Sequence, residues 1–187
     1  MQTRELTLTE VRKAYKEHIC RDFPADERKP LFMIEKALKE QRYLCIGAFE
    51  DGEMAGAAFF VFESGVCLLD YFLVVPEKRS AGIGTAFLKA AASHITADVL
   101  IIEIEDPASA KTPEDATECT RRKSFYMNAG CIETGVRSRC FGVDYLLLEY
   151  PVSGSCPHSR ETVIDGYKKI YMGNLPKFMF EKNVKVE

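Results

Sequence analysis

One glycine-containing stretch sets the frame for the rest of the chain: Val74-Val75-Pro76-Glu77-Lys78-Arg79-Ser80-Ala81-Gly82-Ile83-Gly84-Thr85, residues 74–85. It follows an apolar run and opens a helical pattern, so several backbone N–H groups at the helix start have no partner within the helix. Gly82 and Gly84 lack a Cβ and let a bound group approach that backbone closely. Lys78 and Arg79 add positive charge beside it. The stretch therefore predicts a loop that binds an anion, in particular a phosphate.

The residues before this loop predict an antiparallel meander. Three apolar runs, at 43–49, 54–62 and 66–75, are separated by the short turns Asp51-Gly52 and Ser64-Gly65. Turns of this composition join neighbouring strands into tight hairpins. After the loop, a helix carries Ile83, Phe87 and Ala91 on one face and leads to a strand at 99–105. A strand, a loop, a helix and a second strand predict one parallel, right-handed crossover.

The remaining elements lie on both sides of this core. Residues 3–8 predict a short strand, and two amphipathic helices follow, the first opening at Thr9 and the second with Pro30 in its first position. Thr112-Pro113 starts a helix that we expect to end before Gly130. Residues 132–140 and 143–150 predict two further strands. A helical pattern that includes Val163, Tyr167, Ile170 and Tyr171 comes next, and residues 175–187 fit no assignment.

These elements predict a mixed α/β (α+β) fold in which a twisted, mostly antiparallel sheet with one parallel crossover is flanked by helices. At 187 residues the chain suits one domain. We place this domain at residues 1–150 and expect residues 151–187 to be a C-terminal extension that packs on it.

Composition narrows the function. The 25 Lys and Arg residues against 28 Asp and Glu residues give a net charge of −3, which argues against a nucleic-acid partner. The sequence has no signal-peptide pattern and no apolar run of membrane-spanning length, so we expect a cytoplasmic protein with no membrane partner. The seven cysteines include no Cys-x-x-Cys pair, and we expect reduced thiols and no metal site.

Two motifs carry a resemblance to a known family. Arg79-Ser80-Ala81-Gly82-Ile83-Gly84 resembles the Arg/Gln-x-x-Gly-x-Gly/Ala loop of the GNAT superfamily of acetyl-coenzyme A-dependent N-acetyltransferases. Residues 122–130 are similar to that family's helix, in which Phe-Tyr, three further residues and Gly follow one another. The motifs occur in the family's order, and the resemblance covers about four-fifths of the chain, up to Tyr150. It implies a GNAT-like fold and acetyl-coenzyme A as cosubstrate.

The resemblance also implies roles for individual residues. The backbone N–H groups of Ser80, Ala81, Gly82, Ile83, Gly84 and Thr85, with Arg79 at the start of the loop, would hold the pyrophosphate of coenzyme A. The strand backbone at Leu73, Val74 and Val75 would pair with the pantetheine arm. Tyr126 corresponds to the usual general acid, which protonates the leaving thiolate. The alternative is a core tyrosine that packs beside Phe125.

The acceptor amine needs a group that takes its proton. An alkylamine with a pKa near ~10.4 is unprotonated in only about one molecule in a thousand at neutral pH. Asp70 interrupts an apolar strand, and Glu103 and Glu105 share one face of the next. We rank Asp70 first and Glu103 second as the base. For each carboxylate the alternative is a salt-bridged or solvated strand end, and Glu105 fits that alternative well.

The sequence thus predicts an N-acetyltransferase that moves an acetyl group to a primary amine by direct attack and needs no metal. The acceptor stays open among small amines, amino acids, antibiotics and protein N-termini, and so does a homodimer. One alternative is a non-catalytic sensor that binds coenzyme A. Another is a nicotinamide dinucleotide site, for which Gly82 and Gly84 fit, although Phe87 stands in place of the third glycine.

Overall fold

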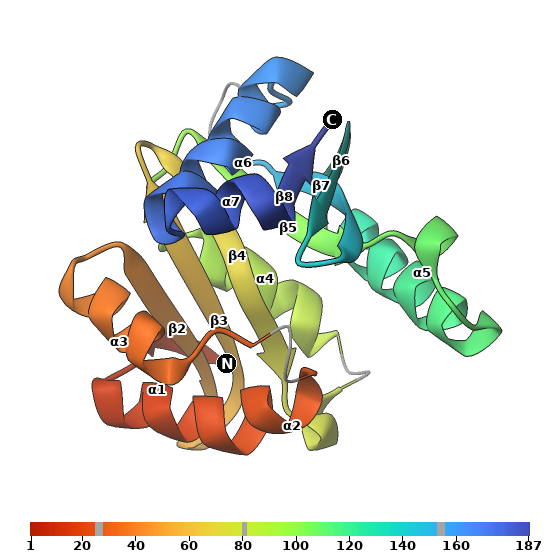
Figure 1. Ribbon diagram of the computed structural model, residues 1–187. Helices are drawn as coiled ribbons and strands as arrows, with labels where there is room; N and C mark the ends of the chain where they lie inside the picture. Colours follow the sequence, from red (N-terminus) through yellow and green to blue (C-terminus); the bar gives the residue numbers. More distant parts are fainter. Residues whose placement is uncertain (25–27, 80–81, 153–155) are drawn as a thin grey trace. The chain divides into compact units, whose positions relative to one another are not determined.

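The structure is a computed structural model that describes residues 1–24, 28–79, 82–152 and 156–187 (Figure 1). The strands hydrogen-bond in the order β1-β2-β3-β4-β5-β7-β6-β8. The sheet is mostly antiparallel with one parallel pair and is flanked by helices, which confirms the expected mixed α/β class. The chain divides into two compact units, residues 1–61 with 69–94 (unit 1) and residues 62–68 with 95–187 (unit 2).

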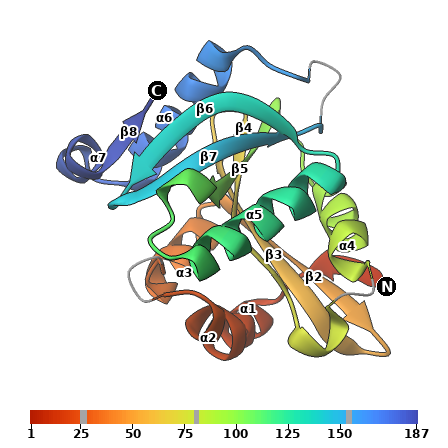
Figure 2. The same ribbon diagram turned by 90° about the vertical axis from the view of Figure 1, so that its right-hand side faces the viewer.

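Unit 1 contains most of the predicted meander and the described residues of the glycine loop. Its helices occupy two faces of strands β2 to β4, with α1 and α3 on one face and α4 on the other (Figures 1 and 2). Phe59, Phe60 and Phe87 are fully buried in its core. The elements are β1 Gln2–Glu5, α1 Leu8–Ala14, the π-helical turn η1 Tyr15–Ile19, α2 Cys20–Asp22, α3 Leu31–Lys39, β2 Tyr43–Glu50, β3 Glu53–Glu63, β4 Val66–Val74, the 3-10 turn η2 Pro76–Lys78 and α4 Ile83–Ala92. β3 ends within unit 2, and β4 begins within it.

The start of the chain differs from the prediction. β1 ends at Glu5, not at Leu8, and α1 begins earlier than expected because Thr7 caps it. The Thr7 backbone N–H donates to the Glu10 carboxylate at 2.8 Å, while the Glu10 N–H donates to Thr7 Oγ1 at 3.4 Å. This reciprocal pair is a capping box, which satisfies two N–H groups at once. The second helix also begins one residue later than predicted, with Pro30 as its N-cap.

Close backbone packing in unit 1 depends on Gly56 of β3. A Cβ at this position would lie 2.7 Å from the carbonyl oxygen of Leu73 in β4 and 3.1 Å from the ring of Phe87 in α4. No side chain fits at such a distance from a backbone atom. Glycine therefore lets β3, β4 and α4 approach one another just before the glycine loop.

Unit 2 holds the second half of the sheet, and its strands at 99–105, 132–140 and 143–150 have the predicted bounds. α5 packs on one face and α6 on the other (Figures 1 and 2). As predicted, Thr112 caps α5, with its Oγ1 accepting from the Asp115 N–H at 3.1 Å. The elements are β5 Val99–Glu105, the 3-10 turn η3 Pro107–Ser109, α5 Pro113–Asn128, β6 Ile132–Cys140, β7 Val143–Tyr150, α6 Arg160–Asn174, α7 Lys177–Asn183 and β8 Val184–Val186.

The C-terminal residues, which the sequence left unassigned, form α7 and a strand. β8 pairs antiparallel with β6, with Val186 opposite Ser138. Arg137 and Glu187 exchange two backbone hydrogen bonds, of 2.8 and 2.9 Å. Residues 160–187 therefore contribute two helices, α6 and α7, and an edge strand to unit 2.

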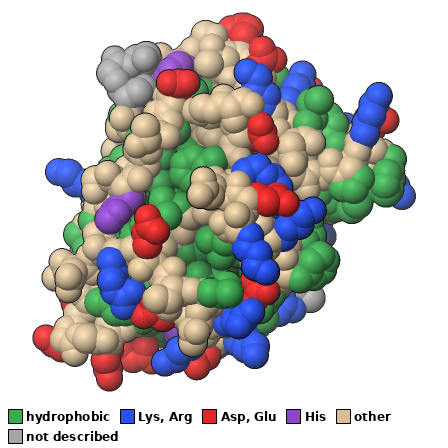
Figure 3. Space-filling view, turned by 90° about the vertical axis from the view of Figure 1, so that its left-hand side faces the viewer, with side chains coloured by type: hydrophobic (Ala, Val, Ile, Leu, Met, Phe, Trp, Pro, Cys, Tyr) green, Lys and Arg blue, Asp and Glu red, His purple; other side chains and the backbone are tan. Residues whose placement is uncertain are grey.

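Three general properties of the described residues bear on function: the distribution of surface charge, the presence of membrane-spanning helices and the presence of metal-binding groups. On the face shown in Figure 3, acidic and basic side chains are interspersed. Within the described parts of the chain, no helix combines the length and apolar character needed to cross a bilayer. The same residues contain no group of three or more His, Cys, Asp or Glu side chains arranged to hold a metal ion.

Candidate functional site

The predicted phosphate-binding loop ends in a left-handed glycine. Gly82 has φ +74° and ψ 0° and is the N-cap of α4. The helix's first internal bond runs from the Ala86 N–H to the Gly82 carbonyl at 3.2 Å, so the N–H groups of Ile83, Gly84 and Thr85 have no carbonyl within α4 to bond. Gly82 and Thr85 are exposed. The predicted residues Ser80 and Ala81 lie outside the described residues.

The geometry at Gly82 fits a bulky anion. Apart from its chain neighbours and its own helix backbone, no atom of the described residues lies within 4 Å of a Cβ built on Gly82, so among these residues the space beside the backbone is open. A non-glycine residue would also be strained at this φ. Three N–H groups at a helix start, next to open space and the positive end of a helix dipole, suit a phosphate group.

The end of β4, predicted to pair with pantetheine, already has part of its backbone engaged. The Val75 N–H donates to the Ala55 carbonyl of β3 at 2.9 Å. The Val74 carbonyl accepts a hydrogen bond of 2.9 Å from Nε of Arg79. The Arg79 guanidinium also pairs with Asp22 at 3.2 Å. Arg79 thus occupies one of the two lone pairs of the Val74 carbonyl.

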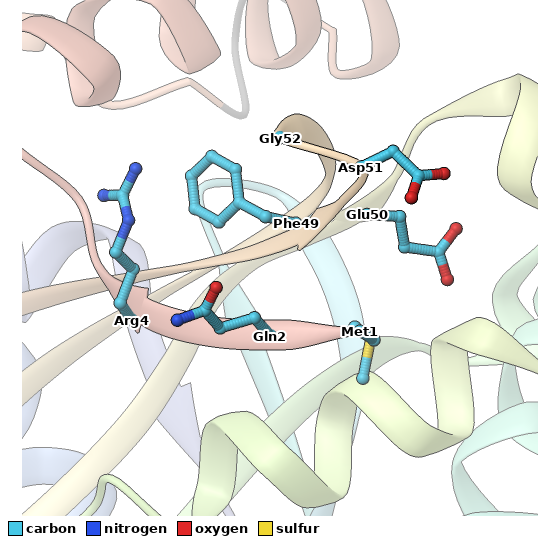
Figure 4. Close-up of a pocket in the computed structure, with 7 residues that line it drawn as sticks. All are labelled: Met1, Gln2, Arg4, Phe49, Glu50, Asp51 and Gly52. Carbon is cyan, nitrogen blue, oxygen red and sulfur yellow. The ribbon is translucent and has the colours of Figure 1, made fainter.

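A second basic residue of the loop turns toward the β2–β3 hairpin. Lys78 pairs with Glu50 at 3.0 Å. Glu50 also lines a shallow recess of about 760 Å³ in unit 1 (Figure 4). In this recess Arg4 lies over the Phe49 ring, 4.1 Å from its centroid. None of the predicted site residues that the structure describes lines it; its described lining residues are Met1, Gln2, Arg4, Phe49, Glu50, Asp51 and Gly52.

Asp70, the first-ranked base, is held by a cation and a phenol. Its side chain is 9% exposed, and its Oδ1 lies 2.5 Å from Nζ of Lys29. The Tyr43 hydroxyl donates to Oδ2. Burial, and then the charge of Asp70, raises the pKa of Tyr43 well above its ordinary value. The carboxylate is thus charge-balanced by the protein itself.

The backbone of Lys29 is fixed as well as its side chain. Its N–H donates to the Tyr71 hydroxyl at 2.7 Å, and its carbonyl accepts from the Tyr15 hydroxyl at 2.8 Å. The Phe59 ring packs edge-on against both Tyr43 and Tyr71. These contacts show that the Asp70–Lys29 pair belongs to a packed cluster of unit 1.

Glu103, the second-ranked base, is held by two phenols of α6. The Tyr171 hydroxyl lies 3.0 Å from Oε1 and 2.8 Å from Oε2, and the Tyr167 hydroxyl donates to Oε1. Burial, followed by the charge of Glu103, raises the pKa of both tyrosines well above the ordinary value. The sequence placed both tyrosines on one helical face and singled out Glu103, but it did not predict their contact, because Glu103 is 64 residues from Tyr167.

Tyr126, the predicted general acid, lies in α5 and is buried. Its ring packs against Phe125 with centroids 4.9 Å apart. Burial raises the pKa of Tyr126 above its ordinary value, and the charge of Arg122 acts in the opposite direction. The phenol therefore keeps its proton at neutral pH, as a proton donor must.

Glu105, the remaining carboxylate, forms the expected salt bridge. Arg122 of α5 lies 3.2 Å from it. The Cys119 thiol donates to the same carboxylate at 3.1 Å, and burial followed by this contact raises the pKa of Cys119 to about 11. In sum, the structure places Asp70 and the described cofactor-loop residues in unit 1, and Glu103 and Tyr126 in unit 2.

Comparison with solved structures finds many similar folds. A GNAT-family acetyltransferase from Bacteroides thetaiotaomicron superposes with a TM-score of 0.66 at 16% identity, over 90% of this chain and 95% of that one. The ribosomal-protein-S18-alanine N-acetyltransferase from Escherichia coli gives 0.58 at 19% identity, over 84% and 98%. An aminoglycoside 6'-N-acetyltransferase complexed with coenzyme A gives 0.55 at 13% identity, over 82% and 98%. At these identities the likeness shows the fold.

Sequence comparison is more specific about the family. No protein of curated function matches the chain. The sequence model of the acetyltransferase (GNAT) family matches residues 11–109, more than half of the chain, and this match includes β4, the glycine loop and β5. The chain therefore belongs to the GNAT acetyltransferase family.

Proposed function

We propose that the protein is an acetyl-coenzyme A-dependent N-acetyltransferase that transfers the acetyl group to a primary amine by direct attack. The observation that carries the proposal is the start of α4, where Gly82 is a left-handed N-cap and the N–H groups of residues 83–85 have no carbonyl within the helix to bond. Membership of the acetyltransferase family supports acetyl-coenzyme A as the anion. Acetyl-coenzyme A would supply an activated acetyl thioester.

In this proposal the chain's own residues bind the cosubstrate and transfer the protons. Arg79 and the described loop residues Gly82 to Thr85 hold the pyrophosphate, as do Ser80 and Ala81. The backbone of Leu73, Val74 and Val75 orients the pantetheine arm. Tyr126 gives a proton to the leaving sulfur, which its raised pKa permits at neutral pH.

In this proposal the two candidate bases change their order. Asp70 must give up its ion pair with Lys29 before it takes a proton from an amine, and the pair is largely buried. Glu103 receives its hydrogen bonds from neutral phenols and is partly exposed. We therefore place Glu103 before Asp70, which reverses the order inferred from the sequence.

Ligand-induced stabilisation tests the loop. The melting temperature is measured with acetyl-coenzyme A, coenzyme A or reduced nicotinamide dinucleotide. A ligand at a hundred times its Kd adds about 2.7 kcal/mol to the free energy of unfolding. We expect a clear rise with both coenzyme A forms and none with the dinucleotide. Absence of any rise with acetyl-coenzyme A would rule the proposal out.

A matched pair of glycine variants locates the effect. Gly82→Ala and Gly142→Ala both replace an exposed glycine of positive φ, +74° and +91°, where the added Cβ has no neighbour beyond the adjoining backbone within 4 Å among the residues that the structure describes. Each should lose about 1 kcal/mol of stability from backbone strain. Only Gly82→Ala should also weaken acetyl-coenzyme A binding. Equal affinities in the two variants would contradict the assignment of the loop.

The acceptor is the next question, and the structural neighbours suggest a panel. Their names include an aminoglycoside, a protein-alanine and a spermidine N-acetyltransferase. We propose kanamycin, an alanine-initiated peptide and spermidine as first acceptors. Binding of acetyl-coenzyme A without turnover of any amine would favour the alternative of a coenzyme A sensor. The cytoplasmic location and the homodimer stay predictions, the latter tested by the mass in solution.

A further inference from the structure

Two tyrosines of α6 donate hydrogen bonds to the carboxylate of Glu103. One phenol proton, that of Tyr171, bridges both carboxylate oxygens at 3.0 and 2.8 Å. The Tyr167 hydroxyl donates to Oε1 and accepts in turn from Oγ of Ser138 at 3.0 Å. The chain of donors therefore runs from β6 through α6 to the carboxylate on β5.

Contacts other than those to Glu103 also hold the two tyrosines in place. They are four residues apart, so they share one face of α6. Tyr167 is fully buried and Ser138 is 4% exposed. The two phenol rings pack with their centroids 4.8 Å apart. A carboxylate bonded to such rigid donors has little freedom to rotate about its own side chain.

The charge state of the network is equally well defined. The raised pKa of each phenol keeps both tyrosines protonated throughout the neutral range. Both hydroxyls therefore donate to Glu103 and stabilise its charged form. Glu103 itself is only partly buried.

We infer that Tyr167 and Tyr171 are positioning residues that hold Glu103 ready to accept the proton of the acceptor amine. The inference rests on the proposed acetyl transfer. In that step the amine nitrogen bonds to the acetyl carbon, the carbon–sulfur bond breaks with its electron pair going to sulfur, and Glu103 takes the amine's proton. Tyr126 returns a proton to the sulfur. Helix α6, in the segment after residue 150, then belongs to the machinery of the reaction.

The test uses the full chain with four variants, Glu103→Gln, Tyr167→Phe, Tyr171→Phe and the control Tyr150→Phe. Tyr150 is a buried tyrosine of the same unit, on β7. Rates are measured from pH 6 to 10 with spermidine, kanamycin and an alanine-initiated peptide. Hydrolysis of acetyl-coenzyme A to acetate is followed in parallel, so that water serves as the acceptor if no amine is used. Melting temperature with acetyl-coenzyme A reports folding and cofactor binding separately from turnover.

The expected results differ between a positioning role and a packing role. Glu103→Gln should lose about 100-fold or more in kcat. Tyr171→Phe and Tyr167→Phe should each lose about tenfold, with KM for acetyl-coenzyme A unchanged. Their rising pH limb should move to higher pH, since each lost hydrogen bond destabilises the charged carboxylate. Tyr150→Phe should match the unmodified protein.

Several results would overturn the inference. Folded Tyr171→Phe with the rate and pH profile of the unmodified protein would refute it, and so would an active Glu103→Gln. If Tyr167→Phe fails to fold, Tyr171→Phe decides alone, because Tyr171 lies nearer the end of α6. A failure of acetyl-coenzyme A to stabilise the unmodified protein would instead refute the proposed function, and this inference with it.

Discussion

The two carboxylates that the sequence offers as bases are held in opposite ways. Asp70, in unit 1, lies against the ammonium group of Lys29 and the phenol of Tyr43. Glu103, in unit 2, accepts hydrogen bonds from the phenols of Tyr167 and Tyr171. The first arrangement neutralises a charge, whereas the second fixes a charged group by neutral donors. A carboxylate in the first setting stabilises the fold, while one in the second keeps its charge for a substrate.

The largest expected effect tests the ion pair of unit 1. Lys29→Met should lower the free energy of unfolding by about 3 kcal/mol, because it leaves the charge of Asp70 buried without its cation. Urea unfolding measures the loss. Lys36→Met is the matched control, since Lys36 is 71% exposed and pairs with Glu40 only at 3.8 Å; it should change stability by less than about 0.5 kcal/mol. Similar losses in the two variants would mean that Asp70 is not balanced by Lys29.

The second test compares the two carboxylates in turnover. Glu103→Gln should reduce kcat by about 100-fold or more, and Asp70→Asn by less than about tenfold. The reason is that Asp70 would have to give up its ion pair with Lys29 before it took a proton, whereas Glu103 is bonded by neutral phenols. Steady-state kinetics with the best acceptor of the panel gives both values. The reverse order would restore the ranking that the sequence suggested.

A third test concerns another carboxylate of unit 1 that is held by a cation, Glu10, which lies on the surface and pairs with Arg4. The guanidinium of Arg4, and then the backbone N–H of Thr7, lowers the pKa of Glu10 to about 2. Because the folded-state pKa lies below the ordinary value, the stabilisation is present above about pH 4.5 and is lost as the pH falls toward 2. The stability gap between the unmodified protein and Glu10→Gln should be about 0.5 kcal/mol at pH 7 and shrink in acid. A gap that 1 M NaCl leaves unchanged would show that Arg4 contributes nothing.

The smallest effect concerns a neutral donor of unit 2. The thiol of Cys119, with a pKa of about 11, donates to Glu105. Glu105→Gln removes the charge that helps to raise this pKa, so alkylation of Cys119 by iodoacetamide at pH 8.5 should become a few times faster. Peptide mass spectrometry measures the alkylation of Cys119 and, as a control, that of Cys131, whose pKa is raised by burial to about 12. Equal acceleration at both cysteines would indicate a general loosening of unit 2.

Much of the fold was predictable because its signals are local. The strand bounds at 99–105, 132–140 and 143–150 agree because turn residues and apolar runs mark both ends. The π-helical turn at Tyr15–Ile19 has no such marker. β8 is only three residues long, and its pairing with β6 connects residues more than forty positions apart, so pattern alone could not find it.

The candidate site was predictable in its residues more than in their partners. Motifs identified the glycine loop and Tyr126, and an unexpected charge in an apolar strand identified Asp70. Lys29 is separated from Asp70 by 41 residues, and Tyr171 from Glu103 by 68. Only the folded chain brings these groups together. The partner therefore decides which carboxylate is stable and which is reactive, and no local pattern reveals it.

Gly56 carries no chemistry, yet its surroundings make it one of the least replaceable positions of unit 1. Any side chain there would strike the Leu73 carbonyl, an atom that no rotamer change can move aside. In a saturation-mutagenesis library selected for acetyl-coenzyme A binding, we therefore expect position 56 to be depleted of every substitution, including alanine. A survey of tolerated changes would rank this residue among the ligand-binding ones, although it acts solely by leaving room for its neighbours.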